Sequence, residues 1–209
     1  LRVSWVADTN LNYTNVCDAN CTFCAFYRPP NGKAKDAYTY TVPEMIEKIK
    51  TSARTYDVTT VLIQGGLNPD LPFSYDADFV AAIRKEVREV HPHLYSAPEI
   101  WKMVEVSGKD IRWVLTELKT AGLDTLPGGG AEILTDRVRS KMSKTKVTTT
   151  NWLAVHEIAH SLGYRSTATM MYGHHDTPED IVEHLINLRG VQDKSVQSGQ
   201  LGFTAFIPW

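Results

Sequence analysis

The amino-acid sequence predicts an α/β fold built on parallel strands. Short runs of β-branched and aromatic residues alternate six times with amphipathic helical patterns, and successive strands joined through helices pair in parallel. Polar and glycine-rich stretches follow the strands rather than the helices, and ligands bind at this edge of parallel α/β sheets. Six such units form either a doubly wound sheet or most of a (β/α) barrel.

The strands are recognised by their composition and by the glycines that end them. VTTVLIQGG is a continuous apolar run, typical of a strand buried on both faces. LDTLPGGGAEI runs from a strand into a glycine-rich loop. The chain stops on the apolar strand GFTAFIPW, so we expect one domain, 1–209, that is truncated at its C-terminal end. The expected strands lie at 2–7, 58–66, 93–97, 123–133, 164–173 and 202–209.

The helices carry local start and stop signals. Thr41 and Glu44 form a capping box at the start of the first, and Ser96 caps a helix with Pro98 in its first turn. Gly122 ends the helix expected at 111–122. The expected helices begin at Thr41 and Ser96 or lie at about 76–90, 111–122, 152–163 and 177–189.

Composition excludes several classes of protein. The 209 residues are 43% hydrophobic and 22% charged, which is ordinary for a globular chain with a sizeable core. The net charge of −2 gives no indication of a nucleic-acid or anionic membrane partner, and no apolar run approaches the length that spans a bilayer. Three cysteines without an export signal indicate a reducing, cytoplasmic compartment.

All three cysteines lie within eight positions, in the loop after the first strand. Cys17, Cys21 and Cys24 are spaced C-x3-C-x2-C, and soft thiolates suit iron–sulfur clusters or zinc. A [4Fe–4S] cluster on three cysteines leaves one iron open to a small molecule, and Phe23 would give it an apolar lid. The alternatives are a zinc site completed by a histidine from elsewhere, or clustering by chance.

These residues resemble the radical S-adenosylmethionine (SAM) superfamily. NLNYTNVCDANCTFCAFYR, LIQGGLNPDLPF, SAPEIWKMVEVSG, LDTLPGGGAEI, RSTATMMYGH and GFTAFIPW are similar to its menaquinone (futalosine-pathway) branch. The similarity is closest to cyclic dehypoxanthine futalosine synthases, with aminofutalosine synthases and the halves of FO synthases as neighbours. It runs over nearly the whole chain and implies a (β/α) TIM-type barrel, of which about six βα units are present.

The resemblance also implies a chemistry. Cys17, Cys21 and Cys24 would hold a [4Fe–4S] cluster, and the amino and carboxylate groups of SAM would chelate its open iron. Reductive cleavage of SAM would yield a 5′-deoxyadenosyl radical that takes hydrogen from dehypoxanthine futalosine, which then cyclises. The implied partner is an electron donor such as flavodoxin or ferredoxin. An aminofutalosine synthase and an FO synthase subunit are the alternatives, because they share these motifs.

Carried over by position, the resemblance assigns cofactor contacts at several strand ends. Gly65 and Gly66 would meet the methionyl amino group, with a plain strand-ending turn as the alternative. Glu132 would bind ribose hydroxyls or, instead, cap the following helix. On the fifth strand Thr167, Thr169 and Met171 alternate with Ala168 and Met170, and one set faces the interior. The full set of expected cofactor contacts is Phe23, Gln64, Gly65, Gly66, Gly129, Glu132, Thr169 and Met171.

Four further polar residues at strand ends are expected to hold the substrate: Asn12, Asn15, His174 and His175. His174 is also the candidate for a late proton acceptor, so His174 and Glu132 are the expected catalytic residues. For each of these side chains, hydrogen bonding within a loop is the alternative.

One motif competes with this interpretation. Residues 156–160 read HEIAH, a literal match to the zinc-protease pattern H-E-x-x-H, but the longer form of that pattern fails because Ser166 stands where a third histidine is needed. The apolar stripe of the helix places His156 and His160 at its flank, away from the strand ends, so we expect no catalytic zinc. A non-catalytic iron–sulfur or zinc domain is a further alternative, disfavoured by the glycines after the strands.

Overall fold

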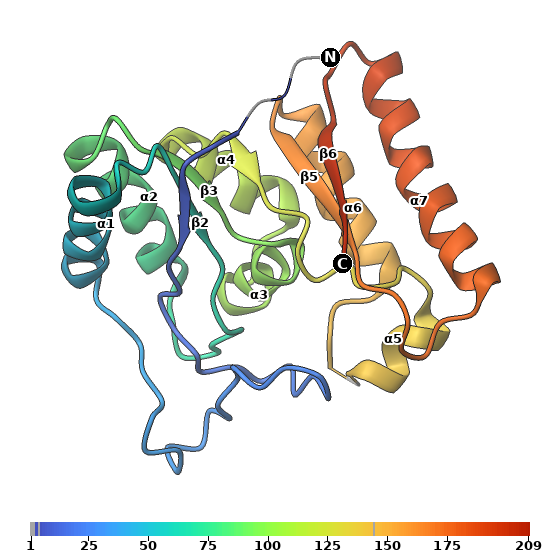
Figure 1. Cartoon of the computed structure of the whole chain (residues 1–209), viewed down its shortest axis with the longest axis horizontal. Coiled ribbons are helices and arrows are strands. Elements are labelled where there is room, and N and C mark those ends of the chain that lie inside the picture. The colour runs from blue at the N-terminus through green and yellow to red at the C-terminus, as the bar shows by residue number, and fades with distance from the viewer. Residues whose placement is uncertain (1–2, 4, 144) are drawn as a thin grey trace.

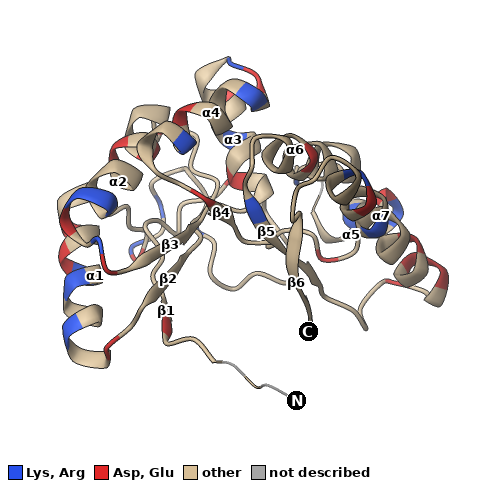
Figure 2. Ribbon diagram, turned by 90° about the horizontal axis from the view of Figure 1, so that it is seen from above, with Lys and Arg blue, Asp and Glu red and all other residues tan. Residues whose placement is uncertain are grey.

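The computed structural model describes residues 3, 5–143 and 145–209. Six parallel strands form an open arc with the helices on its outer side (Figure 2), which is a partial (β/α) barrel. The backbone ladders run β1–β2–β3 and β4–β5–β6. The strands are β1 Asp8–Asn10, β2 Thr60–Ile63, β3 His91–Leu94, β4 Thr125–Leu126, β5 Arg165–Met170 and β6 Phe203–Pro208.

Most helices begin and end within about four residues of the predicted positions, but α7 continues to Gln197, eight residues past its predicted end at 189. Both predicted caps are confirmed, since Thr41 and Glu44 form a capping box and Ser96 is the N-cap of the third helix. The short helix α5 was not predicted, because its sequence DRVRSKM has no side-chain cap bond and only seven residues. The helices are α1 Val42–Tyr56, α2 Phe73–Glu86, α3 Ala97–Ser107, α4 Ile111–Ala121, α5 Asp136–Met142, α6 Thr149–Ser161 and α7 Pro178–Gln197.

Side chains join the two ladders where the described backbone has no strand pairing. The hydroxyl of Thr125, at the start of β4, lies 2.9 Å from a ring nitrogen of each of His91 and His93 on β3. The same hydroxyl donates to the carbonyl of Pro92 at 3.2 Å. Because these contacts replace the missing ladder, the six strands form one curved layer.

The first strand begins later than predicted. β1 pairs Asp8–Asn10 with 60–62. Of the predicted run at 2–7, residues 2 and 4 lie outside the described residues, and Val3 and Trp5 are 89% and 86% exposed. Strand-forming composition reflects fit to a half-buried pleated surface, and these side chains have no such surface here.

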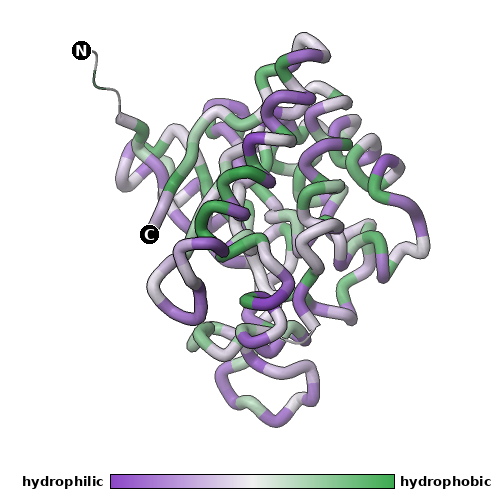
Figure 3. The backbone as a smooth tube through the Cα atoms, turned by 90° about the vertical axis from the view of Figure 1, so that its right-hand side faces the viewer, coloured by the Kyte–Doolittle hydropathy of each residue, from purple (hydrophilic) through white to green (hydrophobic). Residues whose placement is uncertain are grey.

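The hydrophobic core lies between the strand layer and the helices. Phe79 and Ile83 on α2 are fully buried, as is Trp152 on α6. Figure 3 shows the hydrophobic stretches in the body of the molecule and a hydrophilic loop projecting at the bottom of the view. No helix within the described ranges is both long and apolar enough to cross a bilayer.

The histidines of the HEIAH motif are buried in the core, so their predicted position at the flank of the helix is wrong. His156 and His160 are 0% and 2% exposed. His156 Nδ1 lies 3.2 Å and His160 Nε2 lies 2.7 Å from the hydroxyl of Ser166 on β5. Ser166, whose presence breaks the protease pattern, is therefore the group that both imidazoles contact.

The hydrogen bonds of Ser195 determine which ring nitrogen of His160 carries the proton. Ser195 on α7 donates its hydroxyl to the Val191 carbonyl and lies 2.8 Å from His160 Nδ1. We infer that His160 donates from Nδ1 to Ser195 and accepts from Ser166 at Nε2. Glu157 pairs instead with Lys194 at 2.6 Å. The motif therefore ties α6 to β5 and α7.

The stabilisation that His160 supplies is expected to weaken in acid. Burial lowers the pKa of His160 to about 4, whereas an imidazole in the unfolded chain takes a proton near pH 6.5. Between these values only the unfolded state binds the proton, so stability falls as the pH falls. In urea unfolding, the difference in unfolding free energy between the wild type and His160→Gln should shrink by about 2 kcal/mol from pH 7 to pH 5.

The control is His175→Gln, at an exposed position. Its unfolding free energy should differ from that of the wild type by no more than about 0.5 kcal/mol at both pH values. A pH-independent gap for His160→Gln would contradict the assigned protonation.

Candidate functional site

The loops that follow the strands meet at one edge of the barrel. In Figure 1 the carboxyl ends of the strands point to the lower part of the view, where the blue segment that follows β1 and the yellow helix α5 lie. We call residues 17–28 the cysteine loop and residues 64–68 the glycine turn. The glycine turn follows β2 directly.

The cysteine loop keeps all three thiols free. Cys17 is buried beside Ala19 and Leu67, with Cys21 packed against the same small cluster. Burial raises the pKa of the Cys17 and Cys21 thiols, so a metal must displace their protons on binding. In the described part of the chain no three His, Cys, Asp or Glu side chains gather around a point that would hold a single metal ion.

The connection between α5 and α6 anchors the cysteine loop. Thr22 donates its backbone N–H to the Met142 carbonyl at 2.8 Å. Ser143 and Thr145 both donate their hydroxyls to the Ala19 carbonyl, Thr145 at 2.7 Å. These contacts span more than 120 residues of chain, and no local sequence pattern indicates them.

The glycine turn uses the N–H groups of its two glycines inside the protein and leaves two carbonyls free. Gly65 donates to Glu99 Oε1 at 2.8 Å, and Gly66 donates to the Thr14 carbonyl at 2.9 Å. The carbonyl of Gly66 accepts from Asn68, whereas those of Gln64 and Gly65 accept no hydrogen bond from any described residue. The turn therefore offers acceptors.

The glycines of the site are required by the packing of the protein itself. A Cβ atom on Gly65 would overlap the Tyr13 ring, and one on Gly66 would overlap the Val16 carbonyl. The loop after β4 is equally crowded, because a Cβ on Gly129 would overlap the Gln64 amide. Glycine lets these backbones approach, so the predicted cofactor contacts Gln64, Gly65, Gly66 and Gly129 lie together.

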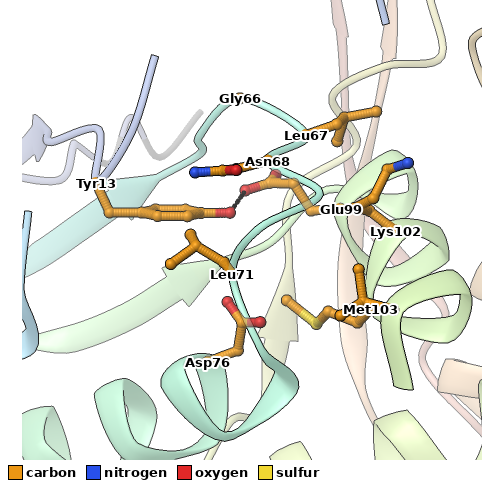
Figure 4. Close-up of a pocket in the computed structure, with 10 residues that line it drawn as sticks. Tyr13, Gly66, Leu67, Asn68, Leu71, Asp76, Glu99, Lys102 and Met103 are labelled. Atoms are coloured by element: carbon orange, nitrogen blue, oxygen red, sulfur yellow. Dashed lines mark hydrogen bonds between the residues drawn. The ribbon is translucent and has the colours of Figure 1, made fainter. Parts of the chain in front are cut away.

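The buried carboxyl of Glu99 has a role that no sequence prediction assigned to it. Its oxygens accept from the Tyr13 hydroxyl, from Gly65 N–H and from both donors of Ser96. Figure 4 shows Glu99 facing Tyr13 beneath the glycine turn, around an internal pocket of about 20 Å³ that Asp76 also lines. Burial raises the pKa of Glu99 and of Asp76. The spacing Ser96-x-x-Glu99 of a capping box is the signal that would have pointed to this residue.

Glu132 and Phe23 come together through a lysine. Glu132 has a left-handed backbone with φ of 44°, and its carboxylate pairs with the buried ammonium of Lys146. The same ammonium lies 5.3 Å from the centre of the Phe23 ring, in the cysteine loop. Glu132 does not cap α5, whose N-cap is Thr135, so that alternative is wrong.

The structure shows which way each of the two alternating sets of side chains on strand β5 faces. Thr167 accepts from the Gly128 N–H at 2.9 Å, and Thr169 donates to the Gly128 carbonyl at 2.7 Å, so the threonine set faces the glycine-rich loop. Ala168 is buried and lines a groove with residues of α7. Met171 packs near Ile133.

A buried arginine, also missed from the sequence, supports the same loop. Arg139 on α5 donates to the carbonyls of Gly130, Ala131 and Val147, and burial lowers its pKa. Three carbonyls and no carboxylate accept its hydrogen bonds within the described chain. The loop after β4 is thus held from below by a positive charge.

The predicted substrate residues are placed mostly by their own loops. Asn15 is buried, and its amide joins the Asp36 carbonyl and the Tyr38 N–H at 2.9 and 2.8 Å. His174 contacts the Met171 carbonyl through Nε2 and accepts from the His175 N–H through Nδ1, both at 2.7 Å. His175 is exposed and Asn12 is half-buried.

Comparison with known proteins identifies the family. The sequence profile of the Radical SAM superfamily matches residues 11–187. The chain belongs to the radical SAM superfamily. Its cysteine loop and glycine turn lie within the matched range.

The curated relatives have more than one named activity. The chain is 41% identical to a 5-amino-6-(D-ribitylamino)uracil–L-tyrosine 4-hydroxyphenyl transferase of Methanopyrus kandleri and 40% to a cyclic dehypoxanthine futalosine synthase of Halalkalibacterium halodurans, each over 99% of the chain and 54% of the relative. It is 43% identical to an FO synthase of Mycobacterium tuberculosis, over 99% of the chain and 23% of that protein. The chain thus spans about half, or less, of these relatives.

Solved structures agree on the fold. SuiB of Streptococcus suis bound to S-adenosylmethionine superposes with a TM-score of 0.61 at 13% identity, over 98% of this chain and 40% of SuiB. The cobalamin-dependent radical enzyme OxsB gives 0.58 at 14%, over 86% of this chain and 26% of OxsB. At this identity the likeness concerns the fold alone, and it confirms the predicted partial TIM-type barrel.

Adding one methyl group to the glycine turn of this radical SAM chain is expected to disrupt the cysteine loop. In Gly66→Ala the new Cβ would meet the backbone of Val16 and the Cβ of Cys17, neither of which can move without shifting the loop. We expect a loss of at least about 2 kcal/mol of unfolding free energy and a lower iron content after reconstitution.

The matched control is Gly190→Ala in α7, where nothing lies within 4 Å of the added Cβ. Alanine should stabilise that helix by about 1 kcal/mol and leave iron binding unchanged. Equal iron contents in the two variants would show that crowding at Gly66 does not position the loop.

Proposed function

We propose that the chain is the barrel of an enzyme that cleaves SAM on a [4Fe–4S] cluster and cyclises dehypoxanthine futalosine in menaquinone biosynthesis. The observation that carries this is the interlocking of the cysteine loop with a glycine turn that exposes carbonyls. Identity to relatives with three different names is 40–43%, so the substrate is proposed from sequence similarity in the stretches TATMMYGHHDT and FIPW.

The donor set suits a cluster. Cys17, Cys21 and Cys24 are free thiols of one loop, and thiolates are the usual ligands of iron–sulfur clusters. A cubic cluster binds its three cysteines through three different irons, so these sulfurs need not converge on one point as they would around a single ion. With SAM bound at its open iron, such a cluster supplies a carbon radical that takes hydrogen from substrate.

The polarity of the glycine turn fits the methionyl end of SAM. An ammonium group is a pure donor, and the carbonyls of Gln64 and Gly65 are free acceptors beside the cysteine loop. The N–H groups of Gly65 and Gly66 are already bonded to Glu99 and Thr14. The two free carbonyls would therefore bind an amino group.

The surrounding side chains would hold charges in place. The pair of Lys146 and Glu132 is buried, and the lysine lies against the ring of Phe23, which is 42% exposed. Glu132 would accept ribose hydroxyls at the same point, with Thr169 and Met171 lining the β5 side and Gly129 the β4 side. His174 would accept a proton at Nδ1 only after releasing the His175 N–H, because Nε2 already carries the proton that it donates to the Met171 carbonyl.

The proposal includes partners and a compartment. Cleavage of SAM needs one electron, and the cyclised substrate radical must then lose one electron and one proton to restore its aromatic ring. An electron donor such as flavodoxin or ferredoxin would supply the first electron, and the cluster would accept the second. Free thiols that hold a cluster need a reducing environment, so we place the enzyme in the cytoplasm. Asn12, Asn15, His174 and His175 remain the candidate contacts to the substrate.

Anaerobic reconstitution with iron and sulfide tests the reaction. With SAM, a reductant and dehypoxanthine futalosine, the protein is expected to form 5′-deoxyadenosine and cyclised product, detected by mass spectrometry. Cys24→Ala removes one cluster ligand and should reduce both products to background. Turnover of an enolpyruvyl-benzoate substrate instead would assign the chain to aminofutalosine synthases, and no cleavage of SAM at all would contradict the proposal.

A further inference from the structure

Helix α3 contacts both loops that the proposed function requires. Its first turn places Glu99 beneath the glycine turn, where Oε1 accepts from Gly65 N–H at 2.8 Å and from the Tyr13 hydroxyl at 2.9 Å. Tyr13 precedes Cys17 by four residues, and its ring fills the space beside Gly65 (Figure 4). One carboxylate oxygen therefore links the segment that leads into the cysteine loop with the glycine turn.

The next turn of the same helix contacts the cysteine loop itself. Lys102 pairs with Asp18 at 2.8 Å, next to Cys17 in the sequence. Lys102 also bonds Glu105 within α3, so the lysine is fixed on the helix from which it reaches the loop. The two loops are thus set relative to each other by one rigid element.

Helix capping does not explain this use of Glu99. A capping box needs one carboxylate oxygen for the N-cap residue, and Oε2 of Glu99 fills that role by accepting from Ser96 N and Oγ at 2.7 and 2.6 Å. Glu44 at the start of α1 does the same for Thr41 with its own Oε2. Glu44 is exposed and its box is confined to the end of α1, whereas Glu99 is buried and has a second oxygen directed to the glycine turn.

The consequence follows from the planarity of the peptide group. The Gly65 N–H and the Gln64 C=O belong to one peptide, and in a trans peptide they point in opposite directions. The described chain has no cis peptides. When Glu99 holds the N–H, it therefore turns the Gln64 carbonyl away from α3. Without this bond the peptide would rotate easily, because the glycine that follows it has no side chain to restrict it.

We propose that Glu99 is a positioning residue for SAM: it fixes the Gln64–Gly65 peptide so that its carbonyl accepts from the methionyl amino group beside the cysteine loop. This inference rests on the proposed function, because it assumes that SAM binds at the glycine turn. It adds a residue of α3 that touches neither the cluster nor SAM.

The test is Glu99→Gln in the reconstituted holoenzyme. The amide keeps the shape of the side chain, but its NH₂ must face one of the two pairs of donors that the carboxylate accepts. SAM affinity, measured by equilibrium dialysis, should fall about tenfold, with iron content unchanged. The KM for SAM should rise while the KM for the second substrate stays the same, and the change that SAM induces in the electron paramagnetic resonance signal of the reduced cluster should weaken.

The matched control is Glu44→Gln, which weakens a capping box of the same chemistry on α1. It should lower stability without changing SAM affinity. Wild-type affinity in Glu99→Gln would overturn the inference, whereas a wild-type protein that binds no SAM would overturn the proposed function itself. If Glu99→Gln loses its cluster, Tyr13→Phe replaces it as the test variant, because this substitution removes only one hydroxyl. A several-fold rise in the SAM dissociation constant of Tyr13→Phe would support the inference, and an unchanged value would overturn it.

Discussion

The candidate site depends on how closely the loops after the strands pack against one another. At Gly65, Gly66 and Gly129 the position of a side chain is already occupied by the Tyr13 ring, the Val16 carbonyl and the Gln64 amide. The strands curve into an arc (Figure 2), and at these three positions the loops that follow them leave no room for a Cβ atom. The cysteine loop therefore takes its place from the loops beside it as well as from its own sequence.

Hydrogen bonding and charge complete what packing begins. The N–H groups of Gly65 and Gly66 are used by Glu99 and Thr14, and the carbonyls of Gln64 and Gly65 stay free. On the other side, the buried guanidinium of Arg139 holds the loop after β4, and Lys146 pairs with Glu132. Buried polar groups without partners are costly, so these bonds fix a polar site within a crowded space.

Local patterns predicted what local physics decides. The capping box at Thr41, the cap at Ser96 and the glycines after β2 follow from residues close together in sequence, and the structure confirms them. The strand expected at 2–7 was wrong because pairing depends on a neighbouring strand. The partners of Glu99 were missed for a similar reason: Tyr13 lies 86 residues away, and no periodicity reports such a contact.

The HEIAH motif shows the same limit of local sequence patterns, because the motif is easily recognised but its contacts come from distant segments. Its spacing places two imidazoles on one face of α6, but Ser166 and Ser195, from β5 and α7, determine what these imidazoles contact. Glu157 faces Lys194 and is not directed at a shared centre. A motif thus sets which groups are available, while the packing around it sets their chemistry.

Mössbauer spectroscopy of the protein reconstituted with ⁵⁷Fe tests whether Cys17, Cys21 and Cys24 hold a four-iron cluster with one corner open to SAM. The expected spectrum is that of one [4Fe–4S] cluster per chain, in which a single iron of the four changes its isomer shift when SAM is added. A cluster in which no iron changes its isomer shift when SAM is added would contradict this claim. So would a thiol site that takes up one zinc ion and no cluster.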